Sequence, residues 1–178
     1  MVKQVMKSCK KCGEIFTPFS TLDKHCYICK KTEQALKNLA KMKKDKLKKQ
    51  KEDLLTVSDY LKLAQQVFNK WVRLRDKDQG CISCGKEING VRHASHYLSS
   101  GGHSAVRFHT DNVWVSCYKC NVMLSGNGIE YRMRLIKKIG VERVEWLEEN
   151  GHEVKRWTKD ELKEIIAEYK KKIKDELY

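Results

Sequence analysis

Four Cys-x-x-Cys pairs constrain this chain more than any other feature, because they account for every cysteine it contains. Secreted disulfide scaffolds rarely space cysteines so regularly, and no signal peptide or apolar stretch of membrane length accompanies them. Two such pairs supply the four thiolates of a closed tetrahedral zinc site. The sequence therefore predicts two structural Zn²⁺ ions in a reducing, cytoplasmic protein without a membrane partner. The pairs are Cys9/Cys12, Cys26/Cys29, Cys81/Cys84 and Cys117/Cys120.

The charge balance indicates a polyanionic partner. The chain has 178 residues and a formal net charge of +14, and it stays strongly basic even when eight thiolates hold two zinc ions. A positive field of this size concentrates polyanions and speeds their capture. Ten lysines lie between Lys30 and Lys51, so much of the charge is concentrated in one segment. We therefore expect a nucleic acid as partner, although a soluble basic protein without such a partner would show the same totals.

Composition divides the chain into three segments. Residues 1–31 hold the first two cysteine pairs in a zinc knuckle that is too small to fold without metal. Residues 32–55 are rich in lysine and lack glycine and proline. They predict a solvated helix, which is either a spacer or an arm along DNA phosphates, and Lys43 and Gln50 interrupt any coiled-coil seam. Residues 56–178 hold the other two pairs and are expected to form the larger domain.

Amphipathic helices are expected to flank two strands in the larger domain. Capping residues and apolar periodicity mark the helix starts, and glycine marks their ends. The predicted helices begin after a cap at Ser58 or at Thr56 with Asp59, span 130–139 and 141–149, and begin again after Thr158 and Glu161; the predicted strands span 91–97 and 106–115.

Residues 81–127 contain side chains suited to phosphodiester hydrolysis, which needs a base, a cation and groups that position both. His96 suits the base, because an imidazole titrates near neutral pH. His93 and Asn121 suit neutral ligands of a divalent cation. Asn112 could pin a backbone turn that holds the imidazole in place.

Each of these assignments has a plainer alternative. His96 could be a buried strand residue and His93 a surface residue. Asn112 could serve only in a turn, and Asn121 could only cap a helix. The other two histidines of this region, His103 and His109, are expected at the surface or facing DNA.

The order of these motifs resembles that of the ββα-metal, or HNH, endonucleases, including phage junction resolvases of the endonuclease VII type. The segments CISCG, HASHY, RFHTDN, CYKCN, LSGN and EYRMRLIKKIG are more closely similar to the NinG (Rap) recombination endonucleases of lambda-like phages. The resemblance extends over nearly the whole chain. It implies a mostly helical α+β protein: a zinc-braced ββα-metal core with flanking helices and an N-terminal four-cysteine zinc knuckle.

The same resemblance implies roles for the individual residues. It makes His96 the general base, Asn112 the middle asparagine of the motif, and Asn121 a ligand of a catalytic Mg²⁺ or Mn²⁺. Ser95 stands where HNH enzymes often carry the other ligand, and His93 is the expected substitute.

The implied activity is metal-dependent nicking of branched DNA, such as D-loops or Holliday junctions, during phage recombination in the bacterial host cytoplasm. Phage or host recombination proteins are implied as further partners. A homodimer would supply the two active sites that symmetric cutting of a four-way junction requires. The alternative is a zinc-containing DNA-binding accessory protein without catalysis, which would have no need of the HASH, DN and CN residues.

Overall fold

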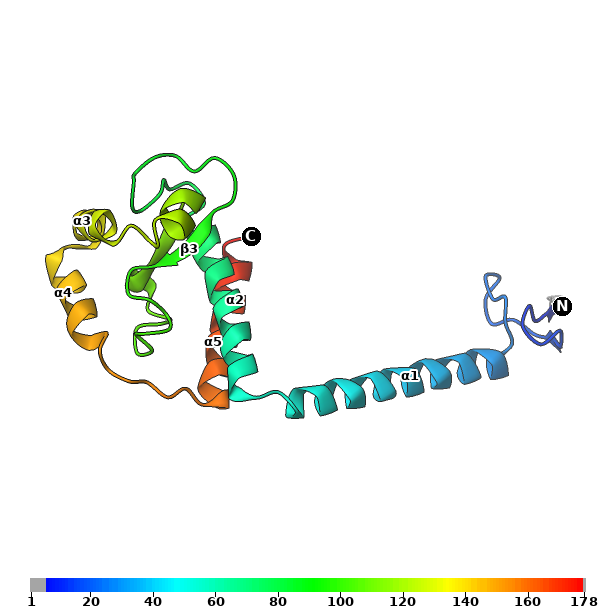
Figure 1. Ribbon diagram of the computed structural model, residues 1–178. Helices are drawn as coiled ribbons and strands as arrows, with labels where there is room; N and C mark the ends of the chain where they lie inside the picture. The colour runs from blue at the N-terminus through cyan, green and yellow to red at the C-terminus, as the bar shows by residue number, and fades with distance from the viewer. Residues whose placement is uncertain (1–5, 178) are drawn as a thin grey trace. The chain divides into compact units, whose positions relative to one another are not determined.

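The computed structural model describes residues 6–177 and divides the chain into two compact units, Met1–Leu55 and Thr56–Tyr178 (Figure 1). Within the described residues, no helix is long and apolar enough to cross a membrane. In chain order the elements are β1 (Lys7–Ser8), β2 (Ile15–Phe16), α1 (Tyr27–Asp53), α2 (Val57–Arg75), β3 (His93–His96), the 3-10 turn η1 (Thr110–Asn112), β4 (Val113–Ser116), the π-helical turn η2 (Lys119–Met123), α3 (Gly128–Ile139), α4 (Val141–Asn150) and α5 (Lys159–Asp175).

The first unit is a short hairpin followed by a long helix. Strands β1 and β2 pair in antiparallel fashion through Lys7 with Phe16 and Ser8 with Ile15. Helix α1 begins at Tyr27, five residues earlier than the lysine-rich composition predicts. The reason is that Cys29 lies in its first turn, where Lys30 N donates to Cys26 O at 3.1 Å. The knuckle and the lysine-rich helix therefore form one continuous unit, and α1 buries none of its residues.

Helices α2 and α5 form one side of the second unit and pack along each other (Figure 1). Both start at capping boxes: the Thr56 hydroxyl accepts from Asp59 N, and the Thr158 hydroxyl accepts from Glu161 N. The first of these decides the choice between Thr56 and Ser58. The contact between the two helices is aromatic, since the Tyr169 ring lies 4.8 Å from the Phe68 ring in edge-on geometry. Such pairs add to the stabilisation that burial alone provides.

Strands β3 and β4 form a two-stranded antiparallel sheet whose register places His93 opposite Ser116 and His96 opposite Val113. The predicted strand over 106–115 is wrong in its first half, because only Val113–Ser116 pairs with β3. The reason is chemical: the Asn112 side chain bonds to the backbone of Leu98 and Val106. These groups are thereby fixed in a loop and are not available to a strand ladder.

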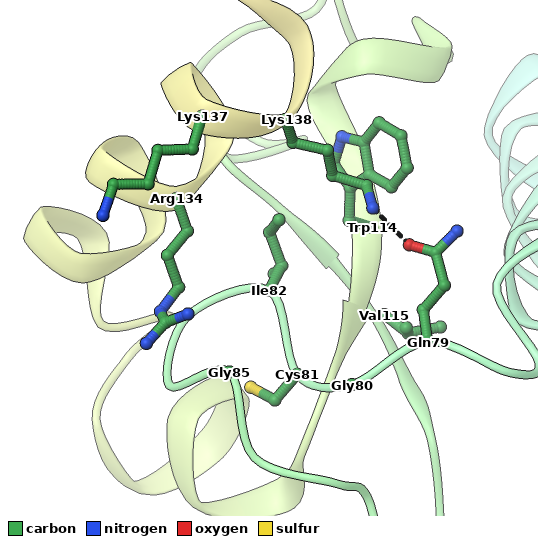
Figure 2. A pocket seen from close by; sticks show the side chains of 10 residues that line it. All are labelled: Gln79, Gly80, Cys81, Ile82, Gly85, Trp114, Val115, Arg134, Lys137 and Lys138. Atoms are coloured by element: carbon green, nitrogen blue, oxygen red, sulfur yellow. Dashed lines mark hydrogen bonds between the residues drawn. The ribbon is translucent and has the colours of Figure 1, made fainter.

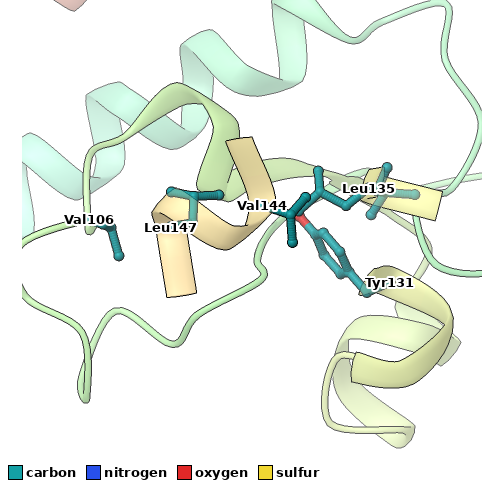
Figure 3. Close-up of a cluster of buried hydrophobic side chains, with 6 residues drawn as sticks. Val106, Tyr131, Leu135, Val144 and Leu147 are labelled. Carbon is teal, nitrogen blue, oxygen red and sulfur yellow. The ribbon is translucent and has the colours of Figure 1, made fainter. Parts of the chain in front are cut away.

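Helices α3 and α4 cover the sheet with an apolar cluster (Figure 3). Gly140, with φ of +87°, ends α3 and begins α4, as the sequence predicts. The Tyr131 hydroxyl donates to Ser95 O at 2.9 Å, so α3 is tied directly to β3. Because the ring of Tyr131 is fully buried, this hydrogen bond also satisfies its only polar group. The buried members are Ile82, Val106, Tyr131, Leu135, Val144 and Leu147.

The end of α2 is fastened to β4 by a buried ion pair. Asp76 is fully buried and accepts hydrogen bonds from Arg75 and from Val115 N. The Arg75 guanidinium also donates to Thr110 O and Val113 O, at 3.1 and 2.7 Å. The carboxylate charge is thus compensated at several points, which a buried charge requires. Residue identities did not indicate this pair, because charged residues at the end of a helix are usually exposed to solvent.

Candidate functional site

Each unit contains a cluster of four cysteines whose sulfur atoms lie within 4.8 Å of one another. The Sγ atoms of Cys12 and Cys26 are 3.7 Å apart, and those of Cys84 and Cys117 are 4.0 Å apart. Tetrahedral zinc with Zn–S bonds of about 2.3 Å requires sulfur atoms roughly 3.8 Å apart. Both clusters therefore fit a zinc ion, and the prediction of two four-cysteine groups is confirmed. The clusters are Cys9, Cys12, Cys26, Cys29 and Cys81, Cys84, Cys117, Cys120.

The two clusters share one local design. In each, the first pair lies in a turn closed by a glycine with positive φ, Gly13 at +80° and Gly85 at +72°. The second pair spans a helical turn, with Lys30 N donating to Cys26 O and Asn121 N donating to Cys117 O. The free backbone N–H groups at the start of a helix favour the negative charge of thiolates. The two clusters differ in the spacing between the pairs, and the longer spacing in the second cluster places β3 and β4 between them.

His96 lies at the end of β3, and its Nε2 is 3.1 Å from the carbonyl oxygen of Arg107. Because a carbonyl oxygen can only accept, Nε2 carries the proton and Nδ1 keeps a lone pair. Burial lowers the pKa of His96 below the usual histidine value, so the ring is neutral at neutral pH. This arrangement suits a general base. The Arg107 carbonyl is a feature that sequence reasoning missed, since a backbone group leaves no signal in residue identities.

Asn112 organises the loop that carries this carbonyl. It is fully buried, and its amide donates to Leu98 O and Val106 O, both at 3.0 Å, while its oxygen accepts from Leu98 N at 2.8 Å. Val106 directly precedes Arg107. The Asn112 side chain therefore sets the position of the carbonyl that orients His96.

We expect Asn112→Ala to destabilise the Thr56–Tyr178 unit by roughly 2–4 kcal/mol, because it leaves one buried backbone group, Val106 O, and two partly buried ones, Leu98 N and O, without their partner. The four tryptophans all belong to this unit, so denaturant unfolding followed by their fluorescence measures its stability. Asn89→Ala, at an exposed loop position, is the matched control and should change stability by less than about 0.5 kcal/mol. Equal stability of the two variants would contradict the structural role of the amide.

His93 lies on the opposite face of β3 from His96, because side chains alternate along a strand. Its ring is 5.8 Å from that of Tyr118, which precedes Asn121 by three residues. Two buried polar atoms on this face, His93 Nε2 and Ser116 Oγ, have no hydrogen-bond partner among residues 6–177. Because these two residues are paired across the strands, their unpaired atoms share one location. Unpaired buried polar atoms require an explanation, and a bound cation or water would satisfy both.

Two acidic side chains of the second unit, Asp111 and Glu148, are engaged by arginines. Arg143 makes two hydrogen bonds to the carboxylate of Asp111, at 2.8 and 2.5 Å. Arg132 makes two to Glu148, at 2.7 and 2.9 Å, and the Arg132 guanidinium holds the pKa of Glu148 below its usual range. Among residues 6–177, His93 belongs to no group of three or more His, Cys, Asp or Glu ligand atoms. A cation at His93 would therefore depend on neutral protein ligands and on oxygen atoms of a substrate.

The remaining histidines of the region, expected at the surface or facing DNA, are partly buried and make structural contacts. His103 Nδ1 lies 2.9 Å from Gly151 O. The His109 ring lies 4.9 Å from the Trp146 ring, and its Nδ1 accepts from Asp111 N. Both rings are partly buried by residues of the α4 region.

Comparison with known proteins gives consistent results. The family model described as Bacteriophage Lambda NinG protein matches residues 1–177. Protein ninG of Escherichia phage 933W is 35% identical over 193 residues, which cover 98% of this chain and 96% of that protein. Protein ninG of Escherichia phage lambda is 43% identical over 131 residues, which cover 74% of this chain and 64% of that protein. Protein ninG of Salmonella phage P22 is 41% identical over the same shares of the two chains. No solved structure matches the chain.

Proposed function

The chain belongs to the NinG family of bacteriophage proteins, and we propose that it is a metal-dependent DNA endonuclease of the HNH type that nicks branched DNA during phage recombination. The observation that carries this proposal is the geometry at His96, where a backbone carbonyl fixes one ring nitrogen and leaves the other free to take a proton. A protein that only binds DNA has no need of an imidazole oriented in this way.

In the proposed reaction, Nδ1 of His96 accepts a proton from the water that attacks the phosphate. Arg107 O keeps the ring in the required tautomer, and Asn112 keeps Arg107 in place. The lowered pKa of His96 ensures that the neutral ring is present at neutral pH. A general base of this kind contributes about 10²–10⁴-fold to the rate.

The cation would be held by His93 and Asn121 on the other face of β3. When bound, a divalent cation offsets the charge that develops on the phosphate and on the leaving oxygen. Because His93 and His96 lie on opposite faces of β3, the cation would leave Nδ1 of His96 free. An imidazole ligand favours Mn²⁺ over Mg²⁺, since Mg²⁺ prefers shells made of oxygen.

Lysines on α1 would provide affinity for DNA without sequence preference, because ammonium groups bind phosphates as mobile point charges. The helix is solvated along its whole length and buries no residue. Its lysines are therefore available to a polyanion.

A nicking assay on linear, Y-shaped and four-way DNA tests the proposal. Magnesium or manganese is added or omitted, and no chelator is used, because a chelator would also remove zinc. We expect nicking that requires the cation and that is faster on branched DNA. Tight DNA binding without nicking under any of these conditions would instead establish the accessory-protein alternative.

Asn121→Ala should raise the cation concentration needed for half-maximal nicking by at least the ~10–100-fold that loss of an outer-shell partner costs a metal site. A cation titration of the nicking rate measures this shift. Nicking at saturating cation should recover in large part, because the base is untouched. An unchanged titration curve would show that Asn121 is not a ligand.

A further inference from the structure

A basic pocket of about 430 Å³ lies between the zinc-binding turn, β4 and α3 (Figure 2). Three of its residues are cations from one face of α3, namely Arg134, Lys137 and Lys138. No carboxylate lines the pocket. It does not include His96, His93 or Asn121, so it is distinct from the site described above. The lining residues are Gln79, Gly80, Cys81, Ile82, Gly85, Trp114, Val115, Arg134, Lys137 and Lys138.

The Arg134 guanidinium is held in place by the zinc-binding turn, toward which it points in Figure 2. A Cβ atom on Gly85 would lie only 2.3 Å from Arg134 Nη1, so the guanidinium occupies the space that any other residue would fill. Among residues 6–177, neither Arg134 nor Lys137 has an acidic partner. Arg134 thus lies against the zinc-binding turn without a carboxylate partner.

The opposite wall fixes the third cation. Lys138 donates to Gln79 Oε1, and its Nζ lies 4.6 Å from the centre of the Trp114 ring. The Arg75 guanidinium lies 4.2 Å from the same ring. Because two cations already cover the indole, Trp114 offers little free surface for a nucleobase to stack on. The pocket therefore suits an anion rather than a base.

We propose that this pocket binds a backbone phosphate of the DNA and so holds one arm of the substrate away from the scissile bond. The inference rests on the proposed function only in taking DNA as the polymer. The guanidinium can make two parallel hydrogen bonds to a phosphate, and the lysines add charge. Because phosphates carry no sequence information, the contact should be independent of sequence and sensitive to salt.

The test compares Arg134→Ala/Lys137→Ala with Lys170→Ala/Lys171→Ala, a control that removes the same charge from exposed positions of α5. Binding to four-way DNA of two unrelated sequences is measured without added divalent cation, at several salt concentrations. The pocket variant should lose roughly 10–100-fold in affinity for both sequences, as expected for lost charge-assisted hydrogen bonds. Its log–log salt slope should fall by about 0.9 for one lost phosphate contact. The control should lose at most a few-fold in affinity.

Three outcomes would overturn the proposal. The first is an equal loss of affinity in the pocket and control variants. The second is loss of zinc from the Arg134→Ala protein, since a zinc ion with four thiolates carries a net negative charge and the guanidinium could serve only that cluster. The third is calorimetric binding of inorganic phosphate that disappears in the pocket variant while DNA affinity is unchanged, which would make the ligand a free phosphate.

Failure of the phosphate site and failure of the proposed nicking activity give different experimental results. If the wild-type protein never nicks DNA but the pocket variant loses DNA affinity, the phosphate site stands and the proposed activity fails. If the wild-type protein nicks DNA while the pocket and control variants bind DNA equally, the proposed activity stands and the phosphate site is refuted.

Discussion

His96→Ala is expected to lower metal-dependent nicking by about 10²–10⁴-fold, the range that a positioned general base contributes. The side chain contacts a backbone carbonyl rather than zinc or the apolar cluster, so its removal should leave the fold intact. Zinc content, tryptophan fluorescence and DNA affinity should therefore match those of the wild type. The measurement is single-turnover nicking of four-way DNA at saturating cation.

His152→Ala is the matched control, because His152 is an exposed histidine of the same unit, outside the residues assigned to the site. It should nick at the wild-type rate. Robust cation-dependent nicking by a pure His96→Ala protein would refute the assignment of the base. An unfolded His96→Ala protein would show that the ring is structural.

The pH dependence gives an independent check on His96. Only the neutral ring can accept a proton, so the rate should rise with pH through the pKa of His96 and level off above it. Burial lowers that pKa, and the acid limb should therefore lie below the pH at which an exposed histidine titrates. An acid limb at or above that pH would argue for a different titrating group.

The sequence predicted those parts of the structure in which residue type determines local geometry. The four Cys-x-x-Cys pairs predicted both clusters, because two cysteine pairs at this spacing can close around zinc. The capping residues Thr56 and Thr158 correctly predicted where α2 and α5 begin, because a hydroxyl at the N-cap accepts from a free backbone N–H group. Gly140 gave the break between α3 and α4.

The parts that failed depend on contacts between distant residues. The apolar residues before Val113 predicted a strand. The Asn112 amide instead donates to Leu98 O and Val106 O, so these carbonyls do not accept hydrogen bonds from a neighbouring strand. The Arg107 carbonyl at His96 and the paired unsatisfied atoms of His93 and Ser116 appear only after the chain is folded. The His109 ring lies 4.9 Å from that of Trp146, a contact between distant parts of the chain that residue identities do not indicate.

Removing one zinc ligand from each unit should destabilise the two units to different extents. Elemental analysis should find two zinc ions in the wild type and one each in Cys9→Ser and Cys81→Ser. Structural zinc contributes an apparent ~10–16 kcal/mol to small zinc domains, which is comparable to or larger than the whole stability of an ordinary domain. The effect on each unit therefore depends on what other interactions support it.

The first unit has almost no other support. Among its described residues, the buried apolar set includes only Cys9 itself. Cys9→Ser should abolish hydrogen-exchange protection at Cys9 N and Lys10 N, whose hydrogen bonds to Glu14 O and Lys24 O close the knuckle. Tryptophan-detected unfolding of the second unit should stay unchanged, because all four tryptophans belong to that unit. The apolar cluster of α3 and α4 and the aromatic contact between α2 and α5 belong to it as well.

In the second unit, both zinc binding and apolar packing stabilise the fold. Cys81→Ser should abolish nicking, because Ile82 N bonds to Val115 O and links the zinc-binding turn to β4, and Asn121 follows the last ligand directly. Exchange protection should be lost in β3 and β4 but persist in α2 and α5, which pack on each other through Phe68 and Tyr169. Full protection of β3 in a Cys81→Ser protein with one zinc would show that apolar packing alone holds the catalytic strand. Uniform loss of protection in α2 and α5 would show instead that the whole unit folds around its metal.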